Sequence, residues 1–421
     1  MKRGKTLWKT LVSASAVLAL TAGSVTAALA EDSTSDTSTV TTDTGILPGD
    51  TSFYKEYKLV TAITADITSP AETFTFTSGK LAAITNSEYE YTNINAATIP
   101  DAVRTISIGT DSTGKNNVSF AAGAATDSGA TAKISIRADI KNYTRPGVYF
   151  YDFKENAGNT AGVVYNSDTY RLMLPVVYET DNKTLKFDTD NVHIIKGTSD
   201  TSGKVTYPYV SNTKKYQNKT NSVTNEYWAG ALRVEKFVTG NVGDKEKAFA
   251  VTVTLTAPKD RIVKSDITLR VTNAPSTNSV SVDDGNALTA ETDGSYKLSA
   301  GNDGWTTKTV TFNVKAGSVY ELKNIPAGVT YVVSEDTGGY APTFSDGNVS
   351  LSTTTSENGV ATMTTAKTMD ATSQEVKISN RKDTSIDTGV FLNNMPYIVL
   401  VAAAGIALVF FMKNQKHQEQ E

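Results

Sequence analysis

Short segments in which polar and apolar residues alternate dominate the chain from residue 52 onward. The clearest of them are residues 73–77, 249–256, 309–314 and 329–333. A period of two residues is that of a strand with one buried face, and Thr, Val, Tyr and Phe suit such a pleated surface. Turn dipeptides, among them Pro146-Gly147 and Ala327-Gly328, separate the segments. The pattern predicts an all-β protein with two tandem immunoglobulin-like β-sandwiches.

Both ends of the chain have an apolar segment beside basic residues. Residues 1–9 contain four basic side chains, residues 11–25 are apolar and small, and Ala28-Leu29-Ala30 provides a cleavage pattern. We therefore expect residues 1–30 to be a secretion signal peptide, because the apolar core is short for a retained membrane helix. Residues 397–412 are apolar and precede Lys413, which predicts a transmembrane helix once residues 390–392 are added. The lysine stays cytoplasmic, so the upstream chain lies outside the cell.

The remaining chain is expected to contain a leader, two domains and a sorting segment. Residues 31–50 are rich in Ser, Thr and Asp, which is typical of a disordered leader. We expect the first sandwich over residues 51–228 and the second over 229–384, with a short hinge near residues 227–231. Residues 385–421 then contain the sorting segment, the membrane helix and a basic tail.

Composition argues against several kinds of function. The chain has no cysteine and only two histidines, so it offers little for a transition-metal site or for His-dependent catalysis. Its net charge of -4, without a basic patch, argues against a nucleic-acid partner. We expect no metal, no cofactor and no activity on an external substrate. An exported protein without disulfides must be stabilised in another way.

Three side chains of the second predicted sandwich could react with one another. Lys236 lies on its first strand, Glu335 on a later strand and Asn380 on the last. If the first and last strands are neighbours, burial would lower the pKa of the lysine and raise that of the glutamate. The acid could then polarise the asparagine carboxamide and transfer a proton while the amine attacks and expels ammonia. The alternative is three solvated side chains on edge strands.

The segments around these three residues resemble the shaft pilins of streptococci and related Gram-positive bacteria. The resemblance rests on residues 232–241, on the sequence IPAGVTY at 325–331 with Ser-Glu-Asp at 334–336, and on ISNRK at 378–382. It implies a Cna B-type domain in which Lys236 is bonded to Asn380 with the assistance of Glu335.

The first predicted sandwich resembles the N-terminal isopeptide-linkage domain of the same pilins. Residues 146–151 with Glu155, followed by residues 164–170, resemble its glutamate strand and the segment after it. The implied bond joins Lys55 to Asn225 and is assisted by Glu155. Lys58 is a second candidate for the lysine, but three residues further along a strand it would face the opposite side.

The C-terminal segment resembles a sortase sorting signal. The motif is Ser385-Ile386-Asp387-Thr388-Gly389, in which Ile386 stands where these signals generally have a proline. The resemblance implies cleavage between Thr388 and Gly389 by a pilus-class sortase. The alternative is a protein that stays tethered to the membrane.

A covalent polymer also needs a lysine that accepts the next subunit. In the pilins this lysine lies shortly before the closing asparagine, so Lys219 is the first candidate, followed by Lys215 and Lys214. The resemblance implies a structural shaft subunit of an extracellular pilus anchored to the cell wall. Its partners would be a sortase, further copies of itself, accessory pilins and the cell wall. The alternative is a singly anchored surface adhesin that binds a host ligand.

Overall fold

The structure is a computed structural model that describes residues 53–82, 100–109, 117–210, 215–283, 285–347, 349–384, 400–401 and 404. The predicted signal peptide, leader and sorting motif lie outside these residues. So does most of the predicted transmembrane segment, of which only residues 400, 401 and 404 are described. Within the described ranges, no helix is both long enough and apolar enough to cross a membrane.

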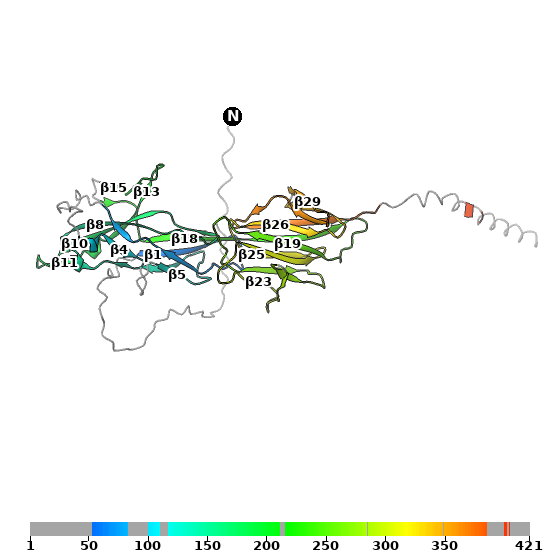
Figure 1. The fold of residues 1–421 in the computed structure, drawn as a ribbon, viewed down its shortest axis with the longest axis horizontal. Coiled ribbons are helices and arrows are strands. Elements are labelled where there is room, and N and C mark those ends of the chain that lie inside the picture. The colour runs from blue at the N-terminus through cyan, green and yellow to red at the C-terminus, as the bar shows by residue number, and fades with distance from the viewer. Residues whose placement is uncertain are drawn as a thin grey trace, which may run out of the picture. The chain divides into compact units, whose positions relative to one another are not determined.

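Two sheets form the first sandwich (Figure 1). One contains β6 (Ala130–Ile134), β1 (Phe53–Val60), the first half of β18 (Ser222–Thr239) and β9 (Val163–Val164). The other has the order β17 (Lys219–Thr220), β12 (His193–Lys196), β10 (Thr169–Tyr178), β8 (Gly147–Lys154), β3 (Gly79–Leu81), β4 (Thr105–Ile108) and β7 (Ile136–Arg137), with β11 (Leu185–Phe187) beside β10.

Smaller elements complete the first sandwich. They are the strand pairs β2 (Glu72–Thr75) with β5 (Asn117–Phe120), β13 (Thr198–Ser199) with β14 (Val205–Thr206), and β15 (Tyr209–Val210) with β16 (Lys215–Tyr216). Within the described ranges, three short 3-10 helices, η2 (Asp101–Val103), η3 (Ile140–Asn142) and η4 (Thr189–Asn191), connect strands.

The second sandwich also has two sheets. One has the order β23 (Tyr296–Leu298), β20 (Ile267–Thr272), β25 (Val319–Pro326), the second half of β18, β32 (Ser373–Arg381), β27 (Ala341–Asp346) and β28 (Val349–Leu351). The other has the order β22 (Asn286–Ala287), β21 (Val280–Val282), β24 (Thr307–Val314), β19 (Phe249–Thr256), β26 (Thr330–Asp336), β30 (Val360–Met363) and β29 (Thr353–Thr355), with β31 (Lys367–Thr368) beside β26.

Each sandwich encloses its own hydrophobic core, and the alternating segments supply the inner faces. In β19, Phe249, Val251, Val253 and Leu255 are buried, while the residues between them are partly exposed. The core of the first sandwich is rich in aromatic rings, such as Tyr57 against Phe74 with ring centroids 5.2 Å apart. The predicted all-β fold with two sandwiches is confirmed.

Strand β18 belongs to both sandwiches without a break. Odd-numbered residues are buried from Val223 to Ala229, and even-numbered residues are buried from Leu232 to Val238. This change of phase turns both Asn225 and Lys236 inward, although their positions differ by eleven, an odd number that would place them on opposite faces of a regular strand. The predicted hinge near residues 227–231 is wrong, because this stretch is strand. The predicted domain limits themselves stay predictions.

Close backbone approach shapes the middle of β18. A Cβ atom added at Gly230 would lie 2.3 Å from the carbonyl oxygens of Asp370 and Thr372. Only glycine therefore lets β18 pass so near the segment before β32. Ala231 N–H donates to Thr372 O at 3.1 Å and fixes this contact.

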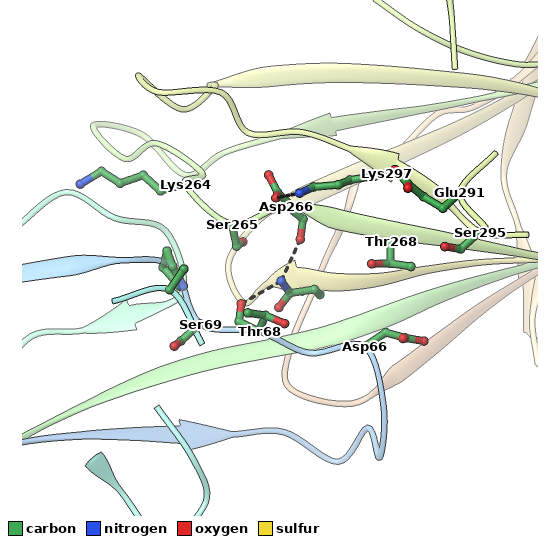
Figure 2. Close-up of a pocket in the computed structure, with 13 residues that line it drawn as sticks. Asp66, Thr68, Ser69, Lys264, Ser265, Asp266, Thr268, Glu291, Ser295 and Lys297 are labelled. Carbon is green, nitrogen blue, oxygen red and sulfur yellow. Dashed lines mark hydrogen bonds and ion pairs between the residues drawn. The ribbon is translucent and has the colours of Figure 1, made fainter. Parts of the chain in front are cut away.

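Polar contacts join the two sandwiches around Asn324. This residue is the extra one in β25 where the pairing with β18 shifts, and it has a φ of 68°. Its Nδ2 donates to Thr68 O at 2.9 Å and to Asp266 O at 2.8 Å, and its Oδ1 accepts from the Tyr227 hydroxyl at 3.2 Å. A cavity of about 320 Å³ lies beside these contacts and is lined by residues of both sandwiches (Figure 2).

Candidate cross-linking sites

The first and last strands of each sandwich are neighbours, and they pair in parallel. Lys55 on β1 and Lys236 on β18 are the two lysines, and their partner strands are β18 and β32. In both pairs the asparagine, Asn225 or Asn380, lies two residues beyond the position opposite the lysine. Residues two apart on a strand share a face, so each lysine and its asparagine point into the same core.

Lys55, Glu155 and Asn225 meet in the core of the first sandwich, and all three are buried. Lys55 Nζ is 2.8 Å from Glu155 Oε2, and Asn225 Nδ2 donates to Glu155 Oε1. Glu155 directly follows β8 in the opposite sheet, so the carboxyl group approaches the lysine and the asparagine from across the core. The Asn225 Oδ1 atom accepts a hydrogen bond of 3.0 Å from the backbone N–H of Asn166.

The second sandwich repeats this arrangement with one difference. Lys236 Nζ donates to Glu335 Oε1 at 2.5 Å, and Glu335 lies on β26 in the opposite sheet. Lys236, Glu335 and Asn380 are all buried. Neither polar atom of the Asn380 carboxamide has a hydrogen-bond partner in the described part of the chain. The carbonyl of Asn225 is thus engaged, while that of Asn380 is not.

The electrostatics of the two sites are alike. Burial lowers the pKa of Lys55 and that of Lys236 from 10.5 to about 8 in each case, although the neighbouring glutamate opposes the change. Burial raises the pKa of Glu155 and of Glu335, and the nearby lysine and asparagine oppose this rise. Asn380 is therefore close enough to influence Glu335 even without a regular hydrogen bond. The shifts favour a neutral amine beside a protonated acid.

Each lysine also lies against an aromatic ring that the sequence analysis missed. Lys55 Nζ is 4.4 Å from the ring centroid of Phe74, and Lys236 Nζ is 4.4 Å from that of Phe249. Phe74 is on β2 and Phe249 on β19, both within alternating segments. The alternation indicated that these rings are buried, but it carried no signal that they contact a lysine.

Both arrangements have the parts needed for amide formation between side chains. A neutral amine can act as the nucleophile, and a protonated carboxyl group can polarise the carboxamide and transfer the proton. Exclusion from water strengthens these interactions and holds the reacting groups near one another.

The other predicted site residues that the structure describes lie apart from the two cores. Lys58 is partly exposed and its Nζ is 3.1 Å from Glu56 Oε1, so it is not the buried lysine of the first site. Lys219 is exposed on the edge strand β17, where partial burial and the nearby charge of Lys215 lower its pKa. Lys215 is exposed on β16. Lys214 and residues 385–389 lie outside the described residues.

Comparisons with known proteins support the resemblance seen in the sequence. A family described as "Domain of unknown function (DUF7601)" matches residues 230–382. A protein of Streptococcus pyogenes serotype M1 named "Pilin" is 23% identical over 273 residues, which is 64% of this chain and 68% of that protein. The chain is thus similar in sequence to a streptococcal pilin, as its motifs predict.

Solved structures of pilins are also similar to this chain. A crystal structure of the major pilin from Streptococcus pyogenes covers 79% of this chain and 98% of its own, with 18% identity and a TM-score of 0.45. The structure of another major pilin protein of Streptococcus pyogenes, T3.2, covers 79% of this chain and 98% of its own, with 16% identity and a TM-score of 0.42.

Proposed function

We propose that this protein is the structural shaft subunit of a sortase-assembled pilus on the surface of a Gram-positive cell. Each of its sandwiches forms a covalent bond between its first and last strands. Lys55 is bonded to Asn225 and Lys236 to Asn380, and the protein acts as an enzyme on nothing but itself. The observation that carries the proposal is the repeated burial of a lysine, a glutamate and an asparagine at the same strand register.

The proposed bond forms without an external reagent. The neutral lysine Nζ attacks the asparagine Cγ, and the carboxyl group of Glu155 or Glu335 donates a proton toward the carboxamide. The new Cγ–Nζ bond replaces the Cγ–Nδ2 bond, and the nitrogen leaves as ammonia after it has received the proton lost by the amine. The glutamate is protonated again at the end, so it acts as a catalyst.

Assembly of the pilus follows from the surface lysine and the sorting motif. A pilus-class sortase would cleave between Thr388 and Gly389 and join Thr388 to Lys219 of the next subunit. Lys219 suits this role because it is exposed on an edge strand and its pKa is lowered. The fibre would then be joined to accessory pilins and to the cell wall.

The intact mass of the purified full chain tests the internal bonds. We expect a mass lower by two molecules of ammonia, and digestion should yield one peptide that joins Lys55 to Asn225 and one that joins Lys236 to Asn380. Glu155→Gln and Glu335→Gln should each restore the mass of one ammonia, because an amide cannot shuttle the proton. An unmodified mass in folded protein would contradict the proposal.

Assembly in cells with the sortase separates the shaft subunit from the singly anchored adhesin. The wild-type chain should give a ladder of covalent polymers, and Lys219→Ala should abolish it. Lys215→Ala is the matched control, since it removes a neighbouring exposed lysine and should leave the ladder intact. A wild-type chain that is anchored only as a monomer would favour the adhesin.

A further inference from the structure

The two cross-linking sites differ in what holds the carbonyl oxygen of the asparagine. In the first site, the backbone N–H of Asn166 donates to Asn225 Oδ1 at 3.0 Å. In the second site, Asn380 Oδ1 has no hydrogen-bond donor in the described part of the chain. This oxygen is where negative charge collects when an amine attacks the carboxamide, so a donor there bears directly on the reaction.

Asn166 is held in place by a network of its own. Its Oδ1 accepts from the Asp168 N–H at 2.9 Å and from the Tyr170 hydroxyl at 3.1 Å, and its Nδ2 donates to Asp168 Oδ2 at 3.1 Å. Lys196 Nζ is 2.6 Å from the same Asp168 oxygen and adds a further link, to β12. These contacts fix the turn between β9 and β10. The backbone N–H of Asn166 therefore already points at Asn225 Oδ1 before the bond forms.

We propose that the backbone N–H of Asn166 is the oxyanion donor for the Lys55–Asn225 bond, and that the second site reacts without such a donor. The inference rests on the proposed function, since it concerns the rate of the same bond-forming step. As Lys55 Nζ adds to Asn225 Cγ, the electron pair of the C=O bond moves to Oδ1. The N–H stabilises this charge until the pair returns and ammonia leaves.

A difference in rate between the two sites follows. Removal of one oxyanion donor from an enzyme slows acyl transfer by roughly 10²- to 10³-fold. With its donor, the first bond should therefore form faster than the second, although both lysines have nearly the same pKa and both acids lie in the opposite sheet.

Newly made protein is required for the test, because bonds already formed persist after unfolding. The full chain is produced by cell-free translation, samples are quenched in acid at intervals, and each cross-linked peptide is quantified by mass spectrometry. Asn166 is replaced during translation by its α-hydroxy acid counterpart, which substitutes an ester oxygen for the backbone N–H and keeps the side chain. Formation of the first bond should slow by about 10²-fold, while the second bond forms at the wild-type rate.

Asn166→Ala is the matched variant, because it keeps the N–H and removes the side-chain network. It should slow the first bond less than the ester does. An ester-containing chain that forms both bonds at wild-type rates would overturn the inference and leave the proposed function intact. Failure of the wild-type chain to form either bond would overturn the proposed function itself. The second bond reports whether the second sandwich folds, and resistance of the first sandwich to limited proteolysis reports whether that sandwich folds, because the two have separate cores.

Discussion

The first and second sandwiches arrange a buried lysine, glutamate and asparagine in the same way but differ in the contacts around the asparagine. Both place the asparagine two residues beyond the position opposite the lysine, both bring an acid from the opposite sheet, and both cover the lysine with a phenylalanine. Among the residues that the structure describes, only the first site adds a loop that donates a backbone N–H to the asparagine oxygen. Strand register and an opposed acid are therefore the shared requirement, and the Asn166 turn is an addition specific to one site.

The largest expected difference between the two sites is in the free energy of unfolding that is lost when each Lys–Asn bond is removed. Asn225→Ala and Asn380→Ala open loops over residues 55–225 and 236–380, and each should lower the free energy of unfolding by about 5 kcal/mol. Asn225→Ala also leaves the Asn166 N–H without its acceptor, which should add about 1–2 kcal/mol. Chemical denaturation followed by circular dichroism measures both. Equal losses in the two variants would mean that the Asn166 contact contributes nothing.

The pH dependence of stability in a variant that lacks both Lys–Asn cross-links should test the pKa of the two buried lysines. In the variant with both Asn225→Ala and Asn380→Ala, the amines have a pKa of about 8 when folded and the ordinary 10.5 when unfolded. Between these values the unfolded state binds more protons, so the free energy of unfolding should rise with pH from about 8 to 10.5. The rise corresponds to about 3 kcal/mol for each lysine.

The buried acids change stability in the opposite direction. Their pKa is raised on folding, so the folded state binds more protons above the ordinary pKa of a glutamate, and stability falls as pH increases through that range. Unfolding curves should therefore show a minimum of stability between the two ranges. The linked wild-type chain has no free amine at Lys55 or Lys236 and is the control. The same alkaline rise in the wild-type chain would contradict the assignment.

The smallest expected effect concerns the aromatic rings. Each ring lies where its face attracts an ammonium group, so Phe74→Leu or Phe249→Leu in the chain without bonds should lower the pKa of its lysine further. A cation–π contact of about 0.5–1 kcal/mol corresponds to less than one pKa unit. Nuclear magnetic resonance titration of labelled lysines measures this shift. Because the two distances are the same, unequal shifts would show that the rings act differently in the two sites.

Much of the fold and of both sites could be predicted from the sequence. The alternation of β19 and β24 is visible because residues facing a core must be apolar every second position. The six residues of the two sites could be named because the segments around them resemble those of the pilins, and the structure brings each set of three together. What remained open was whether the first and last strands pair, since strand order is not encoded in local alternation.

Two other features of the structure could not be predicted from the residue types in the sequence. The donor at Asn166 is a backbone N–H, which every residue except proline has, so no side chain indicates it. The sequence predicts a short hinge near residues 227–231, because one run of strands closes at Asn225 and the next opens at Leu232. In the structure Gly230 instead permits close approach to the segment before β32, and the strand continues. Local composition could not distinguish these alternatives, because the close approach depends on residues far along the chain.

The continuity of β18 determines how a fibre of this protein would carry tension. In the proposed fibre a pull enters at Lys219 and leaves at Thr388, so it bypasses most of the second sandwich through the Lys236–Asn380 bond, and residues 222–235 of β18 transmit it as a single backbone. That segment is already strand, with a rise of about 3.3 Å per residue, close to the maximum length of a polypeptide. Tension can lengthen this segment very little, so the subunit should be nearly inextensible until a covalent bond breaks.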